Sequence, residues 1–175
     1  MWNAVNGLVV EIKTCEKAGA TTSAVAMAFV CIDTMAYLSL PADRETQGKA
    51  DFIAWVDAHL KGHKDQPYQY RGLDVYGARC AVLHAFGSES NFHEKNNDAK
   101  RFGYHGGGKH GFDPEVDERL VIIGTASFLN DVVHAVTSFL DSCKNDADLR
   151  ARVEKRLPRV LATFSIAEGD GQAAA

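Results

Sequence analysis

A long apolar segment, residues 24–40 (AVAMAFVCIDTMAYLSL), constrains the fold more than any other part of the chain. It is apolar on nearly every side of a helix, which is typical of a helix buried among others. Its length is at the short end for a membrane span, and Asp33 at its centre would cost about 2.5–3.5 kcal/mol in the middle of a bilayer. We therefore expect the central helix of a soluble domain, with no membrane partner, and a carboxylate that needs a polar partner of its own.

Helical spacing of apolar residues extends over most of the remaining chain. Around the central helix, here expected over residues 21–40, it predicts helices at residues 3–17, 46–61, 70–86 and 126–144 and a shorter basic helix that ends near Leu157. Residues 87–118 are rich in Gly, Asn, Lys and His and predict a long loop region, around which KRFGYH and RLVIIG could pair as a small β-hairpin. The expected fold class is mostly α: an antiparallel helical bundle with a small β-hairpin or strand element.

Length and composition favour a single domain. A chain of 175 residues with 46% hydrophobic residues can bury a sizeable core. We expect one helical domain over residues 1–167, in which VLATFSI is a terminal strand or a packed extension, and a disordered tail over residues 168–175. The four cysteines lie far apart without a C-x-x-C pair, and the N-terminal segment lacks the features of a signal peptide. A reducing, cytoplasmic location is expected.

The segment VYGARCAVLHAFGSES, residues 75–90, places two polar residues, Arg79 and His84, in an otherwise apolar helix. At 100° per residue they lie about 140° apart around the helix, so they are not on one face. The arginine side chain is long enough to lie along the helix toward its C-terminal end, which leaves convergence of the two polar heads possible. Gly87 is expected to be the residue that ends the helix.

This segment resembles the R-x(4-6)-H motif of the HEPN superfamily, small α-helical domains that include many metal-independent ribonucleases of toxin, phage-defence and RNA-processing systems. The resemblance covers the motif and, loosely, the helical order from Ala20 to Lys144. It implies a bundle of antiparallel helices and a homodimer that brings two motifs into one cleft. Arg79 and His84 match the two motif residues, whereas Cys80 stands where the family often has a polar residue after the arginine.

The chemistry implied by the resemblance is RNA cleavage by the neighbouring 2′-hydroxyl. A histidine with a pKa near neutrality suits transfer of the hydroxyl proton, and the planar donor fork of an arginine suits the crowded phosphate. His84 and Arg79 would carry these two roles, with Asp33 and Cys80 as supporting residues. No metal and no other cofactor is then required.

Two other interpretations remain open. In the first, Arg79 pairs with Asp33 because a buried acid needs a cation or several donors, and His84 caps the end of its helix. In the second, the chain is a catalytically silent helical module that binds nucleic acid or a protein partner, as an antitoxin or a structural protein would. RNA is therefore a possible partner, and so is another protein.

The glycine-rich segment GYHGGGKHGF, residues 103–112, is not a P-loop, because a histidine follows Lys109 where serine or threonine is required. Its bare backbone amides, with Lys100, Arg101 and Lys109, could still contact a nucleic-acid backbone. The net charge of −4 restricts such contacts to local patches like this one and the basic stretch 144–159. The histidines His93, His105 and His110 match no metal-binding spacing, so no metal site is expected.

Overall fold

The computed structural model describes residues 3–160 of the chain. Residues 161–167 of the expected domain, most of the expected terminal strand and the expected disordered tail lie outside the described residues. Within the described range the fold is mostly α, as predicted. The helices are α1 (Asn3–Lys17), α2 (Thr21–Ser39), α3 (Lys49–His59), α4 (Gly72–Ala85), α5 (Asn91–Lys95), α6 (Pro114–Asp117), α7 (Thr125–Asn145) and α8 (Ala147–Arg156), followed by a 3-10 turn at Leu157–Arg159.

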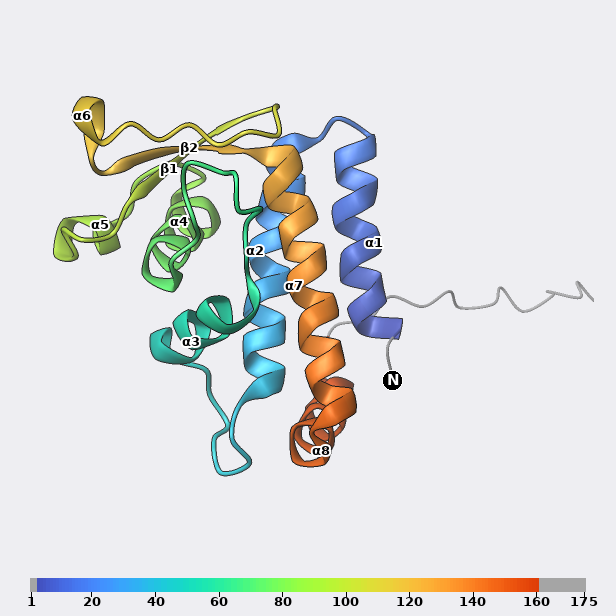
Figure 1. The fold of residues 1–175 in the computed structure, drawn as a ribbon. Helices are drawn as coiled ribbons and strands as arrows, with labels where there is room; N and C mark the ends of the chain where they lie inside the picture. Colours follow the sequence, from blue (N-terminus) through green and yellow to red (C-terminus); the bar gives the residue numbers. More distant parts are fainter. Residues whose placement is uncertain (1–2, 161–175) are drawn as a thin grey trace, which may run out of the picture.

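Helix α2 is the centre of the molecule, as its composition predicted. It packs against α1, α3, α4, α7 and α8 (Figure 1). Helix α1 runs antiparallel to α2, whereas α2 and α7 lie side by side and run in the same direction (Figure 1). The helices therefore form a bundle of mixed direction rather than a purely antiparallel one. By length and composition α2 is also the one described helix that could cross a membrane, but half of its apolar window is buried inside the fold.

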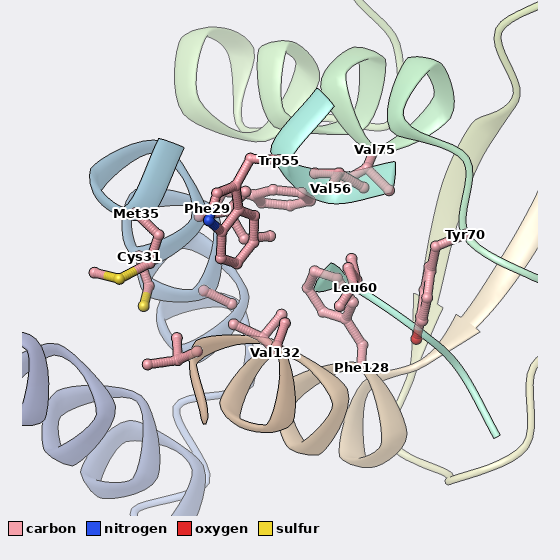
Figure 2. Packing of buried hydrophobic residues seen from close by; sticks show 14 of the residues in the cluster. Phe29, Cys31, Met35, Trp55, Val56, Leu60, Tyr70, Val75, Phe128 and Val132 are labelled. Atoms are coloured by element: carbon pink, nitrogen blue, oxygen red, sulfur yellow. The ribbon is translucent and has the colours of Figure 1, made fainter. Parts of the chain in front are cut away.

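The core lies where α2, α3, α4 and α7 meet. Phe29, Trp55, Val75 and Phe128 come from these four helices and gather in one cluster (Figure 2). Full burial of each such side chain contributes about 1.5–3 kcal/mol relative to leaving it exposed. This cluster fixes α4 against α2, which decides where the polar residues of α4 can reach.

Two strands, β1 (Arg101–His105) and β2 (Leu120–Gly124), form the sheet, but they pair in parallel, so the expected β-hairpin is wrong. Parallel neighbours need a crossover of about a dozen residues or more, and the segment 106–119 provides it. Part of this segment pairs with the other edge of β2, because Gly111 and Ile122 form an antiparallel bridge. The sequence pattern identified both strands but carried no signal for their relative direction.

The end of α2 is held by an arginine from the far end of the described chain. Arg156 in α8 is buried, and its guanidinium donates to the carbonyl oxygens of Leu40 at 2.8 Å, Pro41 at 2.6 Å and Arg44 at 2.9 Å. Leu40 is the residue that ends α2, so its carbonyl has no partner within the helix. Pro41 and Arg44 lie in the turn that follows. Arg156 therefore fastens α8 to the link between α2 and α3.

Candidate functional site

The ion pair between Arg79 and Asp33 joins the middle of α2 to α4. Arg79 Nε donates to Asp33 Oδ2 at 2.8 Å, and Arg79 Nη2 lies 2.8 Å from the same oxygen. Gln47 Nε2 donates to Asp33 Oδ1 at 3.3 Å. Burial lowers the pKa of Arg79, but the hydrogen bond and charge of Asp33, followed by those of Cys80, raise that pKa above its ordinary value. The guanidinium is thus charged and fixed in orientation.

His84 meets the same guanidinium from the other side. Arg79 Nη1 lies 3.0 Å from His84 Nε2. Because a guanidinium has donors and no acceptor, the imidazole must offer a lone pair at Nε2, which makes it the neutral tautomer with hydrogen on Nδ1. The two polar heads therefore converge although their Cα atoms lie on different sides of α4, and Asp33, Arg79 and His84 form one polar row.

Two cavities flank this row. One, of about 690 Å³, is lined by Asp33 and Arg79 together with apolar residues of α1 and α2 and the cations Lys49 and Arg159. The other, of about 590 Å³, is lined by Cys80 and His84 and by the segment 89–94. Asp33 and Arg79 thus line a cavity that also contains two other cations, whereas His84 lines the second cavity.

The helix end next to His84 differs from the expected one. Helix α4 stops at Ala85, and the residue in the left-handed conformation is Phe86 (φ 51°, ψ 37°), not Gly87. The Phe86 N–H donates to Val82 O at 3.1 Å and the Gly87 N–H donates to Ala81 O at 3.1 Å. The bond from Phe86 is the single 5→1 bond of the αL motif, in which a phenylalanine here takes the position that glycine usually fills.

The cations of the loop region do not join the Arg79 row. Lys100 Nζ donates to the carbonyl of Glu118 at 2.6 Å and lies 4.7 Å from the centre of a phenylalanine ring. Arg101 pairs with Asp117 at 2.8 Å and also with Glu89. Lys109 is exposed and lines a separate cavity. Of the three residues expected to contact nucleic acid, Lys109 is the one whose side chain makes no hydrogen bond or ion pair in the described part of the chain.

The three histidines of the metal hypothesis are used in hydrogen bonds. His93 Nε2 lies 3.2 Å from Lys100 O, and His105 Nε2 lies 2.7 Å from Lys109 O. His110 is buried between two other groups described below. Over residues 3–160 no three His, Cys, Asp or Glu side chains come together in a way that could hold a metal ion.

A second polar row went unnoticed in the sequence. The Gly124 N–H donates to His110 Nδ1 at 3.1 Å, so His110 carries its hydrogen on Nε2, which lies 2.8 Å from Tyr70 Oη. The Tyr70 hydroxyl then donates to Asp131 Oδ2 at 3.0 Å. Burial raises the pKa of Asp131, against the lowering effect of the Tyr70 hydrogen bond. The row ties the glycine-rich segment to α7, and its members lie too far apart in sequence for spacing to reveal it.

Lowering the pH from 7 to 5 is expected to destabilise the fold through His93 and His110. Burial lowers the pKa of both rings below the ordinary value. The unfolded chain therefore takes up protons below about pH 6.5 that the folded chain does not, and each ring lowers the free energy of unfolding by at most about 1.4 kcal/mol per pH unit. Urea unfolding at pH 7 and pH 5 measures this dependence.

The matched comparison for this pH dependence is between two single variants. His93→Asn should reduce the loss of stability at pH 5, whereas His63→Gln, at a histidine whose side chain is 69% exposed, should leave it unchanged. Equal unfolding free energies of the parent protein at the two pH values would contradict the assignment.

Comparison of the chain with known protein families, with curated proteins and with solved structures found no match.

Proposed function

We propose that the protein is a metal-independent endoribonuclease of HEPN type, which cleaves RNA through attack of a 2′-hydroxyl on the adjacent phosphate. The observation that carries the proposal is the contact of 3.0 Å between Arg79 Nη1 and His84 Nε2, on a guanidinium held by Asp33. A fixed cation and a neutral imidazole at one point are two of the groups that this reaction needs. The class of such enzymes includes toxins, phage-defence proteins and RNA-processing proteins.

In the proposed mechanism a phosphate oxygen of the RNA accepts the Nη1–H of Arg79 in place of His84. The lone pair at His84 Nε2 is then free to take the proton of the 2′-hydroxyl. The 2′-oxygen forms a bond to phosphorus, the bond from phosphorus to the 5′-oxygen breaks, and the leaving oxygen is protonated. The products are a 2′,3′-cyclic phosphate and a 5′-hydroxyl end, with Arg79 stabilising the charge that develops on the phosphate.

A homodimer is part of the proposal. One chain supplies one arginine and one histidine of this kind, so a second group to protonate the leaving oxygen has to come from elsewhere. A symmetric pair of chains that places both motifs in one cleft would supply it. The proposed protein is thus active as a dimer.

The alternative proposal is a catalytically silent module that binds nucleic acid or a protein partner. The observation in its favour is that the N–H donors of the Arg79 guanidinium already have partners, Asp33 at one edge and His84 at another. A structural ion pair of this kind needs no substrate. Activity measurements separate the two proposals.

His84→Ala and Arg79→Ala are each expected to lower RNA cleavage by about 100-fold or more, because proton transfer and charge stabilisation each contribute that much. Cleavage by the parent protein should persist in excess chelator and yield cyclic phosphate ends, and light scattering should give the mass of a dimer. Labelled RNA resolved on a denaturing gel measures the rate and the end groups.

The control for lost charge is Lys13→Ala, since Lys13 is exposed and pairs with Glu16 in its own helix, α1. This variant should cleave RNA as the parent does. A requirement for divalent metal, a monomer at micromolar concentration, or full activity in both Arg79→Ala and His84→Ala would overturn the proposal and favour the silent module.

A further inference from the structure

Asp131 in α7 is a buried carboxylate with one oxygen left without a partner. The residue is 8% exposed, and its Oδ2 accepts the Tyr70 hydroxyl at 3.0 Å. Within residues 3–160 its Oδ1 accepts no hydrogen bond, and it is not among the unpartnered side-chain atoms that are sealed from solvent. A buried carboxylate with a single donor is costly, because its two oxygens can accept about four hydrogen bonds. Oδ1 is therefore open to a donor from outside the chain.

Asp131 lines a cavity of about 690 Å³, together with the segment 61–66, the glycine-rich segment and the start of α7. This volume lies within the range of small-molecule sites, about 300 to 1,000 Å³. Among the described residues the cavity shares none with the two cavities at Arg79 and His84. Every described residue that lines it is polar, charged or a glycine, and Asp131 is the buried one among them. Such a lining suits a hydrophilic ligand rather than a lipid or an aromatic ring.

Gln66 fixes the walls of this cavity. Its Nε2 donates to Gly108 O at 3.0 Å and to Ser127 Oγ at 3.2 Å, and its Oε1 accepts the His110 N–H at 2.8 Å. One side chain thus ties the segment before α4 to the glycine-rich segment and to α7. The floor is fixed as well, by the row of hydrogen bonds that ends at Asp131. Groups that are held in place before binding lose little freedom when a ligand arrives.

The charges around the cavity define two ends of a ligand. Lys61 and Lys109 are exposed at its rim, and the Lys109 side chain makes no hydrogen bond or ion pair in the part of the chain that the structure describes. Asp65 is paired with His63 at 3.5 Å, which leaves Asp131 as the acid with an open oxygen. A phosphate is attracted to the lysines and repelled by the carboxylate at the floor, whereas a neutral hydroxyl can donate to that carboxylate. An amine at the floor would meet both lysines.

We propose that this cavity binds a small sugar phosphate. A hydroxyl group of the sugar donates to Asp131 Oδ1, as ribose hydroxyls donate to a carboxylate in dinucleotide-binding proteins. Ser127 precedes Asp131 by one helical turn and lines the same cavity, so its hydroxyl lies beside the sugar. The phosphate is held at the rim by Lys109 and Lys61. This site is separate from the proposed nuclease site and does not depend on it.

Isothermal titration calorimetry of the full-length protein with ribose 5-phosphate and glucose 6-phosphate tests the site. At least one of the two should bind, about 10-fold or more tightly than inorganic phosphate or the free sugar, because each half satisfies only one end of the cavity. Asp131→Asn keeps the shape of the side chain and an acceptor for Tyr70 but replaces the open oxygen by an amide. It should weaken binding by about 10- to 100-fold, the range for a hydrogen bond to a charged group.

Matched controls make the same changes away from the cavity. Asp141→Asn alters an exposed aspartate of the same helix and should leave the Kd unchanged. Lys109→Ala should weaken binding of the sugar phosphate and keep the melting temperature, because this side chain is exposed. Lys64→Ala removes an exposed lysine that does not line the cavity and should bind as the parent does. Thermal melts without ligand distinguish a lost contact from a lost fold.

Each result decides the proposal. Binding of a sugar phosphate that is weakened by Asp131→Asn and Lys109→Ala but not by their controls supports the site. If Asp131→Asn melts well below the parent, the comparison of Lys109→Ala with Lys64→Ala decides. Failure of both sugar phosphates to bind, equally tight binding of inorganic phosphate, or unchanged affinity in a folded Asp131→Asn protein or in Lys109→Ala overturns it. RNA cleavage is not measured, so failure of the proposed nuclease leaves this result standing.

Discussion

Asp74→Ala is expected to lower the free energy of unfolding by about 3–5 kcal/mol, because it removes a fully buried carboxylate that accepts four hydrogen bonds, two of them from the half-exposed Arg71. The Asp74 carboxylate is fully buried and accepts from Tyr68 Oη at 2.9 Å, from Arg71 Nε at 2.9 Å and Nη2 at 2.8 Å, and from the Lys100 N–H at 2.9 Å. Its removal leaves the Tyr68 hydroxyl and the Lys100 amide without their acceptor. Urea unfolding followed by circular dichroism measures the loss.

The control for this prediction is an aspartate in an exposed ion pair. Asp141 bonds to Lys144 at 2.8 Å, and their side chains are 55% and 67% exposed, so Asp141→Ala should cost less than about 1 kcal/mol. A loss of stability in Asp74→Ala no larger than in Asp141→Ala would show that Asp74 does not organise the start of α4 and the start of β1.

Gly72→Ala is expected to destabilise the protein by about 3 kcal/mol, at the top of the range for overpacking. A Cβ at Gly72 would lie 2.6 Å from the backbone carbonyl oxygen of Ile53 and 2.9 Å from Asp57 Oδ1. The carbonyl belongs to α3 and cannot move aside as a side chain can. The same Asp57 oxygen also accepts the Gly72 N–H at 2.6 Å, so α3 and α4 would have to separate.

Gly7→Ala is the matched control, because it makes the same chemical change inside a helix with open space around it. A Cβ at Gly7 has no neighbour within 4 Å. Alanine should therefore stabilise α1 by about 0.5–1 kcal/mol, the ordinary difference in helix propensity. Opposite signs for the two substitutions in thermal melts would verify the close approach at Gly72, and equal signs would refute it.

The helices were predictable because each one carries its own signal. The apolar segment 24–40 predicted the central place of α2, and glycine and proline residues predicted most helix ends within a few positions. Short elements carry too little pattern, and α5 and α6 were accordingly missed inside the expected loop. The direction of β1 against β2 depends on the path of the crossover between them, which local sequence does not encode.

The candidate site was predictable only in part. Arg79 and His84 could be selected from spacing on one helix, and Asp33 from its isolation in an apolar segment. The hydrogen bonds that join Tyr70, His110 and Asp131 could not, because these residues are 40 and 61 positions apart and none is unusual in its own surroundings. Phe86 was missed because the glycine after it was the better candidate for a left-handed residue.

The arginine that fastens α8 to the end of α2 has a consequence for the order in which the chain can complete its fold on the ribosome. Arg156 is translated 112 to 116 residues after the carbonyls that it binds. At about 5–20 residues per second, the end of α2 waits on the order of 10 s for its last partner to be made. Throughout that time the most apolar helix of the protein has emerged without the segment that locks it in place, which is the interval in which a nascent chain most needs protection from aggregation.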